Sequence, residues 1–263
     1  MTNAFSLYAA RQSGLHRLNP LTTLALVGFC IVAGLALPGP WGPYAVFLLV
    51  LLPLAAWGRV LPDLLRGALK IALPFAISVF LIQGLFWTGG TPVVGLGPLS
   101  LKREGLLFAL QSTGRILAII GSFLLLALTT RPDALMRTLD QHGLPKALTY
   151  VVLATIQIAP RFQAKANTIL DAQRSRGLET EGSVRQRIRA LLPLVIPLVL
   201  GSLIDIEERA MSLEARAFSR TGEKTSLLVL PDSAAQRLAR ALLLLGMIAA
   251  VAGALAVRVW WRA

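Results

Sequence analysis

The chain has 263 residues, of which 55% are hydrophobic and only 15% are charged, and its formal net charge is +13. Its mean hydropathy of +0.67 excludes an ordinary soluble domain, in which roughly a quarter of the residues are charged. A single cysteine, Cys30, excludes a disulfide framework within the chain. We therefore expect an integral membrane protein, in which the excess of Lys and Arg reflects the positive-inside bias of cytoplasmic loops and not binding to nucleic acid.

Apolar blocks that approach the length of a membrane-spanning helix, about 20 residues, recur along the chain. They cover residues 21–37, 41–57, 68–87, 105–130 and 241–257. Asn19 is a good N-cap for the first block, and Pro20 suits its first turn. Because the second block follows after a short Pro-Gly-Pro turn, the first is interpreted as a retained helix and not as a signal peptide.

Loop charges predict the orientation of these helices. Basic residues flank the first two blocks on the same side, namely Arg11, Arg17, Arg59, Arg66 and Lys70, whereas the turn between the two blocks carries no charge. The N-terminus is therefore expected in the cytoplasm and the loop 88–104 outside, although Lys102 and Arg103 in that loop weaken the pattern.

Residues 131–240 do not resemble ordinary membrane spans. A short amphipathic helix is expected to begin at Pro132 and to end at Gly143. The apolar stretch 151–159 is too short to cross a bilayer, and the stretch 191–204 is short and interrupted by Pro193 and Pro197. We predict three regions: a four-helix membrane region (1–130), a cytoplasmic or interfacial helical region (131–240) and a last membrane helix (241–263).

The helical region contains two amphipathic arms. In the first, from about residue 148, the side chains that share one helix face are Arg161, Lys165, Thr168, Ala172 and Arg176, while Phe162, Ala166 and Ile169 lie opposite. In the second, the apolar stripe is Leu203, Ile206, Ala210, Leu213 and Ala217, and the polar face carries Asp205, Arg209, Ser212 and Arg216. Asp205 and Arg209 have the spacing of a favourable ion pair within the helix.

Each arm ends in an arginine between small residues. Ser175 and Gly177 flank Arg176, and Ala215 and Ala217 flank Arg216. Such a guanidinium stands clear of bulky neighbours and is suited to a planar contact with a carboxylate on another protein. The alternative is that Arg176 only complements the negative end of its own helix, which contributes about 0.3–1 kcal/mol.

Two segments resemble the signature motifs of EcfT, the transmembrane coupling subunit of energy-coupling factor transporters, a family that includes subunits of cobalt and biotin importers. They are Ala172-Gln173-Arg174-Ser175-Arg176-Gly177 and Glu214-Ala215-Arg216-Ala217-Phe218. Supporting similarities lie in residues 14–20 (Gly-Leu-His-Arg-Leu-Asn-Pro), 130–132 (Thr-Arg-Pro) and 143–145 (Gly-Leu-Pro), so the likeness covers nearly the whole chain. Ser175 stands where Ala is common and Ala217 where Gly or Ser is common, but small size is retained.

The resemblance implies an all-α integral membrane protein with about five transmembrane helices and long coupling helices in an L-shaped arrangement. Arg176 and Arg216 would dock into two cytoplasmic ABC-type ATPases. The apolar sides of the arms, represented by Phe162, Ile169, Leu203, Ile206 and Leu213, would cradle a substrate-binding membrane protein (the S component) that topples during vitamin or metal-ion uptake. The chain would lie in the inner membrane of a prokaryote with both arms in the cytoplasm.

By the same resemblance, the chain itself would bind no cofactor, and its partners would use ATP and Mg. In line with this, Gly222-Glu223-Lys224-Thr225 lacks the spacing of a phosphate-binding loop. His16 and His142 show no metal-site spacing, and no set of catalytic residues indicates an enzyme. The alternatives are the membrane subunit of a conventional ABC importer and, with less support, a small membrane enzyme built around Asp133, Asp140 and His142.

Arg115 lies within the fourth apolar block, where a charge costs about 2.5–3.5 kcal/mol on insertion scales. Such a residue invites a functional hypothesis. The alternative is a structural arginine that snorkels or packs against backbone carbonyls in the bundle interior.

Overall fold

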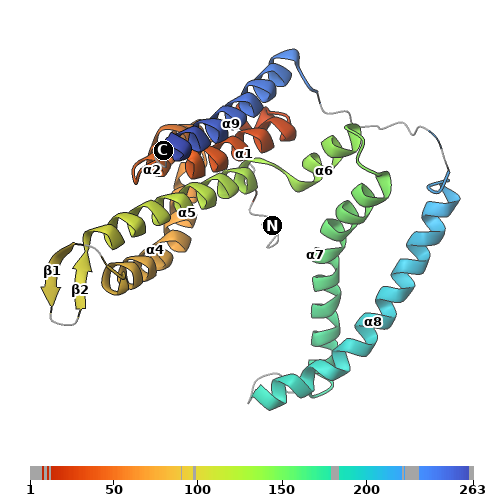
Figure 1. Cartoon of the computed structure of the whole chain (residues 1–263). Coiled ribbons are helices and arrows are strands. Elements are labelled where there is room, and N and C mark those ends of the chain that lie inside the picture. The colour runs from red at the N-terminus through yellow and green to blue at the C-terminus, as the bar shows by residue number, and fades with distance from the viewer. Residues whose placement is uncertain are drawn as a thin grey trace. The chain divides into compact units, whose positions relative to one another are not determined.

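The computed structural model describes residues 8, 11, 13–89, 91–96, 99–178, 184–220, 222 and 231–260. The chain forms two compact units (Figure 1). The membrane unit comprises Met1–Leu144 together with Leu230–Ala263, and the arm unit comprises Pro145–Val229. The sequence-based division into membrane and cytoplasmic regions, with boundaries at residues 130 and 240, concerns location in the membrane and not compactness. It therefore stays a prediction.

Every predicted apolar block is helical. The helices of the membrane unit are α1 (Pro20–Ala36), α2 (Gly42–Val46), a π-helical turn (η2, Phe47–Leu51), α3 (Leu52–Trp57), α4 (Leu61–Phe86), α5 (Arg103–Thr129), α6 (Pro132–Gln141) and α9 (Ala234–Trp260). Within the described residues, three of these are long and apolar enough to cross a membrane: α4, α5 and the part of α9 over Ala234–Val257. The other two apolar blocks form shorter helices, and the 17 residues of α1 extend about 26 Å, close to the ~30 Å hydrocarbon core. The prediction of an all-α membrane protein is confirmed.

Local signals set the ends of these helices as predicted. The backbone N–H of Leu21 donates to Asn19 Oδ1 at 3.0 Å, so Asn19 caps α1, and Pro20 is its first residue. The helix α6 begins at Pro132, and Gly143 follows it with φ +96°. Residues 88–104, predicted as a loop, also contain a feature that the pattern did not indicate, an antiparallel hairpin of β1 (Pro92–Leu96) and β2 (Leu99–Lys102).

The core of the membrane unit lies where α1, η2, α4 and α5 meet. Leu51, Leu64 and Leu125 are fully buried there. Small residues allow the helices to approach closely: a Cβ on Gly105 of α5 would lie only 2.1 Å from the carbonyl oxygen of Gln83 on α4. The α4–α5 pair therefore depends on a glycine at this crossing.

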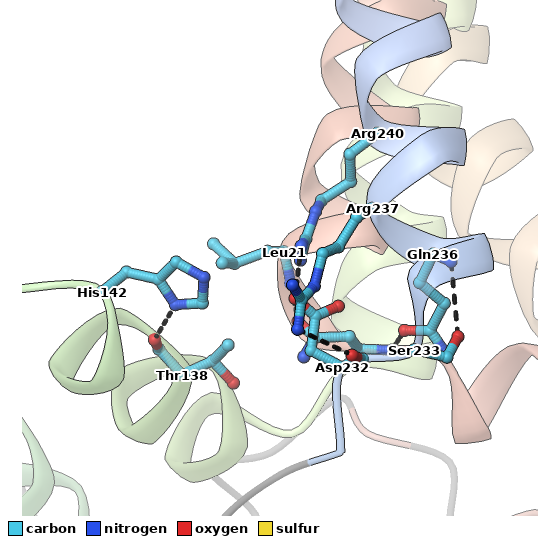
Figure 2. A network of polar contacts seen from close by, with 9 residues as sticks. Leu21, Thr138, His142, Asp232, Ser233, Gln236, Arg237 and Arg240 are labelled. Atoms are coloured by element: carbon cyan, nitrogen blue, oxygen red, sulfur yellow. Dashed lines mark hydrogen bonds and ion pairs between the residues drawn. The ribbon is translucent and has the colours of Figure 1, made fainter.

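A polar network fixes the start of α9 (Figure 2). Asp232 accepts a hydrogen bond from Arg240 at 2.5 Å and lies 3.4 Å from Arg237 Nε. Gln236 in the first turn accepts from the backbone N–H of Asn19 at 2.9 Å, which ties α9 to the cap of α1. The hydrogen bond from Arg240 is the main cause that lowers the pKa of Asp232; desolvation opposes it, and the charges of Arg240, Arg237 and His142 lower the pKa further.

Gly105→Ala is expected to lower the thermal midpoint of the purified protein, because overpacking at a rigid backbone contact costs about 1–3 kcal/mol. The matched control is Gly253→Ala on α9, where an added Cβ meets nothing within 4 Å. Tryptophan fluorescence during heating measures both variants. Equal midpoints for the two variants would contradict the close packing of α4 on α5.

Asp232→Asn is expected to destabilise the protein at neutral pH and to remove part of its acid sensitivity. The folded-state pKa of Asp232 lies below its ordinary value of 3.8, so its contribution to stability is present above that value and is lost as the pH falls through the folded-state pKa. The difference in thermal midpoint between wild type and variant, followed from pH 7 down to pH 3, should therefore shrink toward the acid end. A difference that does not depend on pH would refute this.

Candidate functional site

The arm unit is built from two long helices, α7 (Lys146–Ser175) and α8 (Val184–Ala215) (Figure 1). Lys165 of α7 contacts Gly201 and Asp205 of α8, and the ring of Tyr150 near the start of α7 lies 5.0 Å from that of Phe218 just after α8. The first contact joins the middle of α7 to the middle of α8, and the second joins the beginning of α7 to the end of α8. The two helices therefore run antiparallel.

The continuity of α8 corrects one expectation. The stretch 191–204 was predicted as a short, proline-interrupted segment, but it lies inside a single helix of 32 residues. Pro193 and Pro197 each remove only one backbone donor, and because they are four residues apart both losses fall on one face of the helix. The rest of the hydrogen-bond ladder continues around them. The apolar stretch 151–159 is likewise part of α7, which also contains Pro160.

Lys165 forms the contact at which the two helices cross. Its Nζ donates to the carbonyl oxygen of Gly201 at 2.9 Å and to Asp205 Oδ2 at 2.7 Å. A Cβ on Gly201 would lie 2.8 Å from both Cε and Nζ of Lys165, so a glycine makes room for the lysine. The predicted pair of Asp205 with Arg209 is wrong, because the carboxylate of Asp205 instead binds the lysine of the neighbouring helix.

Arg176 occupies the C-cap of α7. The N–H of Gly177 donates to Arg174 O at 2.9 Å and the N–H of Leu178 donates to Gln173 O at 3.0 Å. These two bonds define a Schellman motif, in which a left-handed residue directly follows the cap. Gly177 has φ +89°, a conformation that glycine adopts without a Cβ penalty.

Arg216 occupies the equivalent position at the end of α8. Ala217 N–H donates to Glu214 O at 2.9 Å, and Phe218 N–H donates to Leu213 O at 3.0 Å. The left-handed residue is here Ala217, with φ +57°. A left-handed alanine costs roughly 1–2 kcal/mol, so the second cap carries a strain that the first does not.

Both signature motifs therefore fold into the same cap with an exposed arginine in the same place. Within the described part of the chain, neither guanidinium has a side-chain hydrogen bond or an ion pair. Counted from the Lys165–Gly201 contact, Arg176 lies about 16 Å along α7 and Arg216 about 22 Å along α8. Because the helices are antiparallel, the two arginines point to opposite ends of the pair.

The cap geometry explains a feature that the sequence-based interpretation missed. An apolar residue follows each arginine by two positions, Leu178 in one motif and Phe218 in the other. An apolar residue at this place often accompanies a Schellman motif. The sequence of arginine, small residue and apolar residue could therefore have predicted a Schellman motif at the end of each arm.

A groove of about 950 Å³ lies between α7 and α8. Of the residues predicted to pack against a partner, Phe162, Ile206 and Leu213 line it, whereas Ile169 and Leu203 are not among the lining residues. Phe162, Leu203 and Ile206 are exposed. Charged side chains also line the groove, namely Arg161, Lys165, Asp205, Glu208 and Arg209.

Other residues singled out in the sequence are placed as follows. Arg115 lies mid-way along α5, and its buried Nε has no hydrogen-bond partner. His16 lies 2.7 Å from the hydroxyl of Ser13 through Nδ1. Among the residues that the structure describes, no group of three or more His, Cys, Asp or Glu side chains is placed to hold a metal ion. The Lys-Thr pair at 224–225 lies outside the described residues.

Comparison with known proteins decides the family. The model of the CbiQ family, described as cobalt transport protein, matches residues 11–227. The chain belongs to this family. It is 30% identical over 222 residues to an energy-coupling factor transporter transmembrane protein EcfT of Listeria innocua, a match that covers 80% of this chain and 83% of the relative.

Two further relatives carry the same description. The EcfT protein of Heliobacterium modesticaldum is 30% identical over 227 residues, with 82% of this chain and 84% of the relative covered. That of Bacillus subtilis is 27% identical over 243 residues, with 84% and 91% covered. The predicted resemblance is confirmed, and the chain is a membrane protein of the EcfT and CbiQ family, whose members are non-catalytic transmembrane components of transporters.

The two caps give paired predictions of opposite sign. Gly177→Ala forces a Cβ into a left-handed conformation and is expected to weaken the first cap by about 1–2 kcal/mol. Ala217→Gly removes the same strain and is expected to strengthen the second cap by less than about 1 kcal/mol, because glycine also has more freedom when unfolded.

Hydrogen exchange measured by mass spectrometry on peptides containing Leu178 and Phe218 reports on the two cap amides. Each variant serves as the control for the other, since the two caps lie at opposite ends of the helix pair. Faster exchange at Phe218 in Ala217→Gly would contradict the assigned geometry.

Proposed function

We propose that this protein couples ATP hydrolysis by two cytoplasmic ATPases to the movement of a substrate-binding S component during uptake of a vitamin or a metal ion. The observation that carries the proposal is the matched pair of caps. Two motifs forty residues apart form the same helix end, and each presents one exposed arginine.

In each cap, backbone groups make the hydrogen bonds, and the arginine side chain stays available to bind a partner. The Schellman bonds satisfy carbonyls that would otherwise accept from the guanidinium, so the side chain stays available for contact with another protein. Arginine forms bidentate bonds with carboxylates, and this geometry is specific as well as strong. Two such tips at opposite ends of one helix pair suit a pair of similar ATPase subunits.

Membership of the family supports a division of labour between this chain and its partners. In this proposal the partner ATPases bind and hydrolyse ATP with Mg, while this chain binds no cofactor. The S component packs on the apolar side of the arms, through Phe162, Ile169, Leu203, Ile206 and Leu213, and selects the cargo. The N-terminus and both arms lie on the cytoplasmic side of a prokaryotic inner membrane, as the loop charges support.

The direct test is co-purification of the tagged protein from its own host in mild detergent. Wild type is expected to bring down ATPase subunits, and the double reversal Arg176→Glu with Arg216→Glu is expected to lose at least about 90% of them. This loss follows because a reversed charge at a carboxylate contact changes attraction into repulsion. Quantitative mass spectrometry of the eluate provides the measurement.

Arg220→Glu is the matched control, because it reverses an exposed arginine only four residues from Arg216. It should retain the ATPases. If wild type captures no ATPase, the coupling function is wrong. If the double reversal retains the ATPases, the two arginines are not the docking residues.

A further inference from the structure

The ring of Tyr150 joins the two arms at a point that the coupling function leaves unexplained. Tyr150 lies in the second turn of α7. Its ring centroid is 5.0 Å from that of Phe218, and the two ring planes form an angle of 54°. Both side chains are half-buried. A tilted pair at this distance is a favourable aromatic contact.

Phe218 belongs to the cap that holds Arg216. Its backbone N–H donates to Leu213 O at 3.0 Å and so closes the Schellman motif. Between Arg216 and Phe218 lies Ala217, which has φ +57°. A left-handed alanine is strained, and the contact of Phe218 with Tyr150 stabilises the cap against that strain.

The first cap is built differently. Gly177 adopts the left-handed conformation, with φ +89°, and pays no Cβ penalty there. Leu178, which has no ring, takes the place that Phe218 has in the second cap. The aromatic contact therefore belongs to the arm whose cap is strained.

Two contacts together set the angle between the arms. Tyr150 lies fifteen residues before Lys165 on α7, and Arg216 lies fifteen residues after Gly201 on α8. Both are therefore about 22 Å from the crossing. Because the helices are antiparallel, the end of α8 comes level with Tyr150. A change in the crossing angle at Lys165 would separate the two rings.

We propose that Tyr150 is a positioning residue for Arg216. Its ring holds Phe218 against α7, so the second docking arginine keeps a fixed place relative to the start of the first arm. The proposal rests on the coupling function, since it concerns the contact of Arg216 with an ATPase. It gives the first turns of α7 a part in docking by the arginine that α8 carries.

The place of Tyr150 in the chain links docking to the rest of the protein. Tyr150 follows closely after Leu144, at which the membrane unit ends and the arm unit begins. A force on Arg216 thus reaches the start of α7 through one side-chain contact. Tyr150 also lines the groove between α7 and α8 together with Leu213, a residue proposed to pack on the S component. Docking at the cap and packing in the groove therefore share this ring.

Hydrogen exchange of the full chain, purified in detergent without partners, tests the contact itself. In Tyr150→Ala, the peptide that contains Phe218 is expected to exchange about threefold to tenfold faster, as follows from the loss of one aromatic pair. The peptide that contains Leu178 should exchange as in wild type. Tyr150→Phe should match wild type at both caps because, among the described residues, the ring of Tyr150 makes the contact and its hydroxyl has no hydrogen bond.

Capture of ATPase subunits tests the function of the contact. Each arm is measured by itself during co-purification from the host: Arg176→Glu leaves the second arm, and Arg216→Glu leaves the first. Tyr150→Ala is expected to lower capture by about threefold to tenfold in the Arg176→Glu background and to leave it unchanged in the Arg216→Glu background. Tyr150→Phe should retain capture in both.

Leu148→Ala is the matched control, because Leu148 lies in the same stretch of α7 and is 54% exposed. It should behave as wild type in both assays. A general disturbance of α7 would instead change this variant as well, or would lower capture through both arms.

Selective loss through the second arm, with Tyr150→Phe unaffected, supports the proposal. An unchanged exchange rate at Phe218 in Tyr150→Ala overturns it, and so does an equal loss of capture through both arms. Capture of no ATPase by the wild type contradicts the coupling function, and the docking role of Tyr150 falls with it. Unchanged capture by Tyr150→Ala in the Arg176→Glu background, beside a wild type that captures ATPase, overturns this inference alone.

Discussion

The last turn of a helix leaves carbonyl groups without partners, and the arm unit depends on how this chain satisfies them. At both arm ends the backbone turns back through a left-handed residue and donates to those carbonyls. The residue just before the turn is then held in one orientation with its side chain outward. The backbone of an arginine at that position is therefore fixed, while its guanidinium N–H groups stay available for other partners.

Close approach plays the corresponding role in the membrane unit. Glycine at position 105 lets α5 lie against the backbone of α4, and Tyr44 packs over Gly114 while its hydroxyl donates to Leu110 O at 2.9 Å. Apolar side chains gain little from association when lipid surrounds them, so tight van der Waals packing and a few internal hydrogen bonds must hold such helices together. The polar network around Asp232 then fixes α9, which is distant in sequence, onto the start of α1.

Features set by neighbouring residues could be predicted from the sequence. The five apolar blocks, the cap at Asn19 and the ends of α6 all follow from local composition. Contacts between distant residues could not be predicted in this way: Asp205 had a suitable partner four residues along its own helix, yet it binds Lys165. The sequence-based interpretation also missed that α8 continues without a break through Pro193 and Pro197. It treated each proline as a helix breaker because of the lost backbone donor. It did not take into account the helical residues on either side. The hairpin of β1 and β2 depends on pairing between the two strands. In so short a segment, no alternation of apolar and polar residues predicts that pairing.

The crossing of α7 and α8 has a mechanical consequence. Because Lys165 joins the helices between their ends, the contact can act as a fulcrum with one arginine on each lever arm. With arms of about 16 Å and about 22 Å, a rotation of about 10° around it would displace the tips by roughly 3 Å and roughly 4 Å. A small change in the crossing angle is therefore enough to shift both tips by about the length of a hydrogen bond.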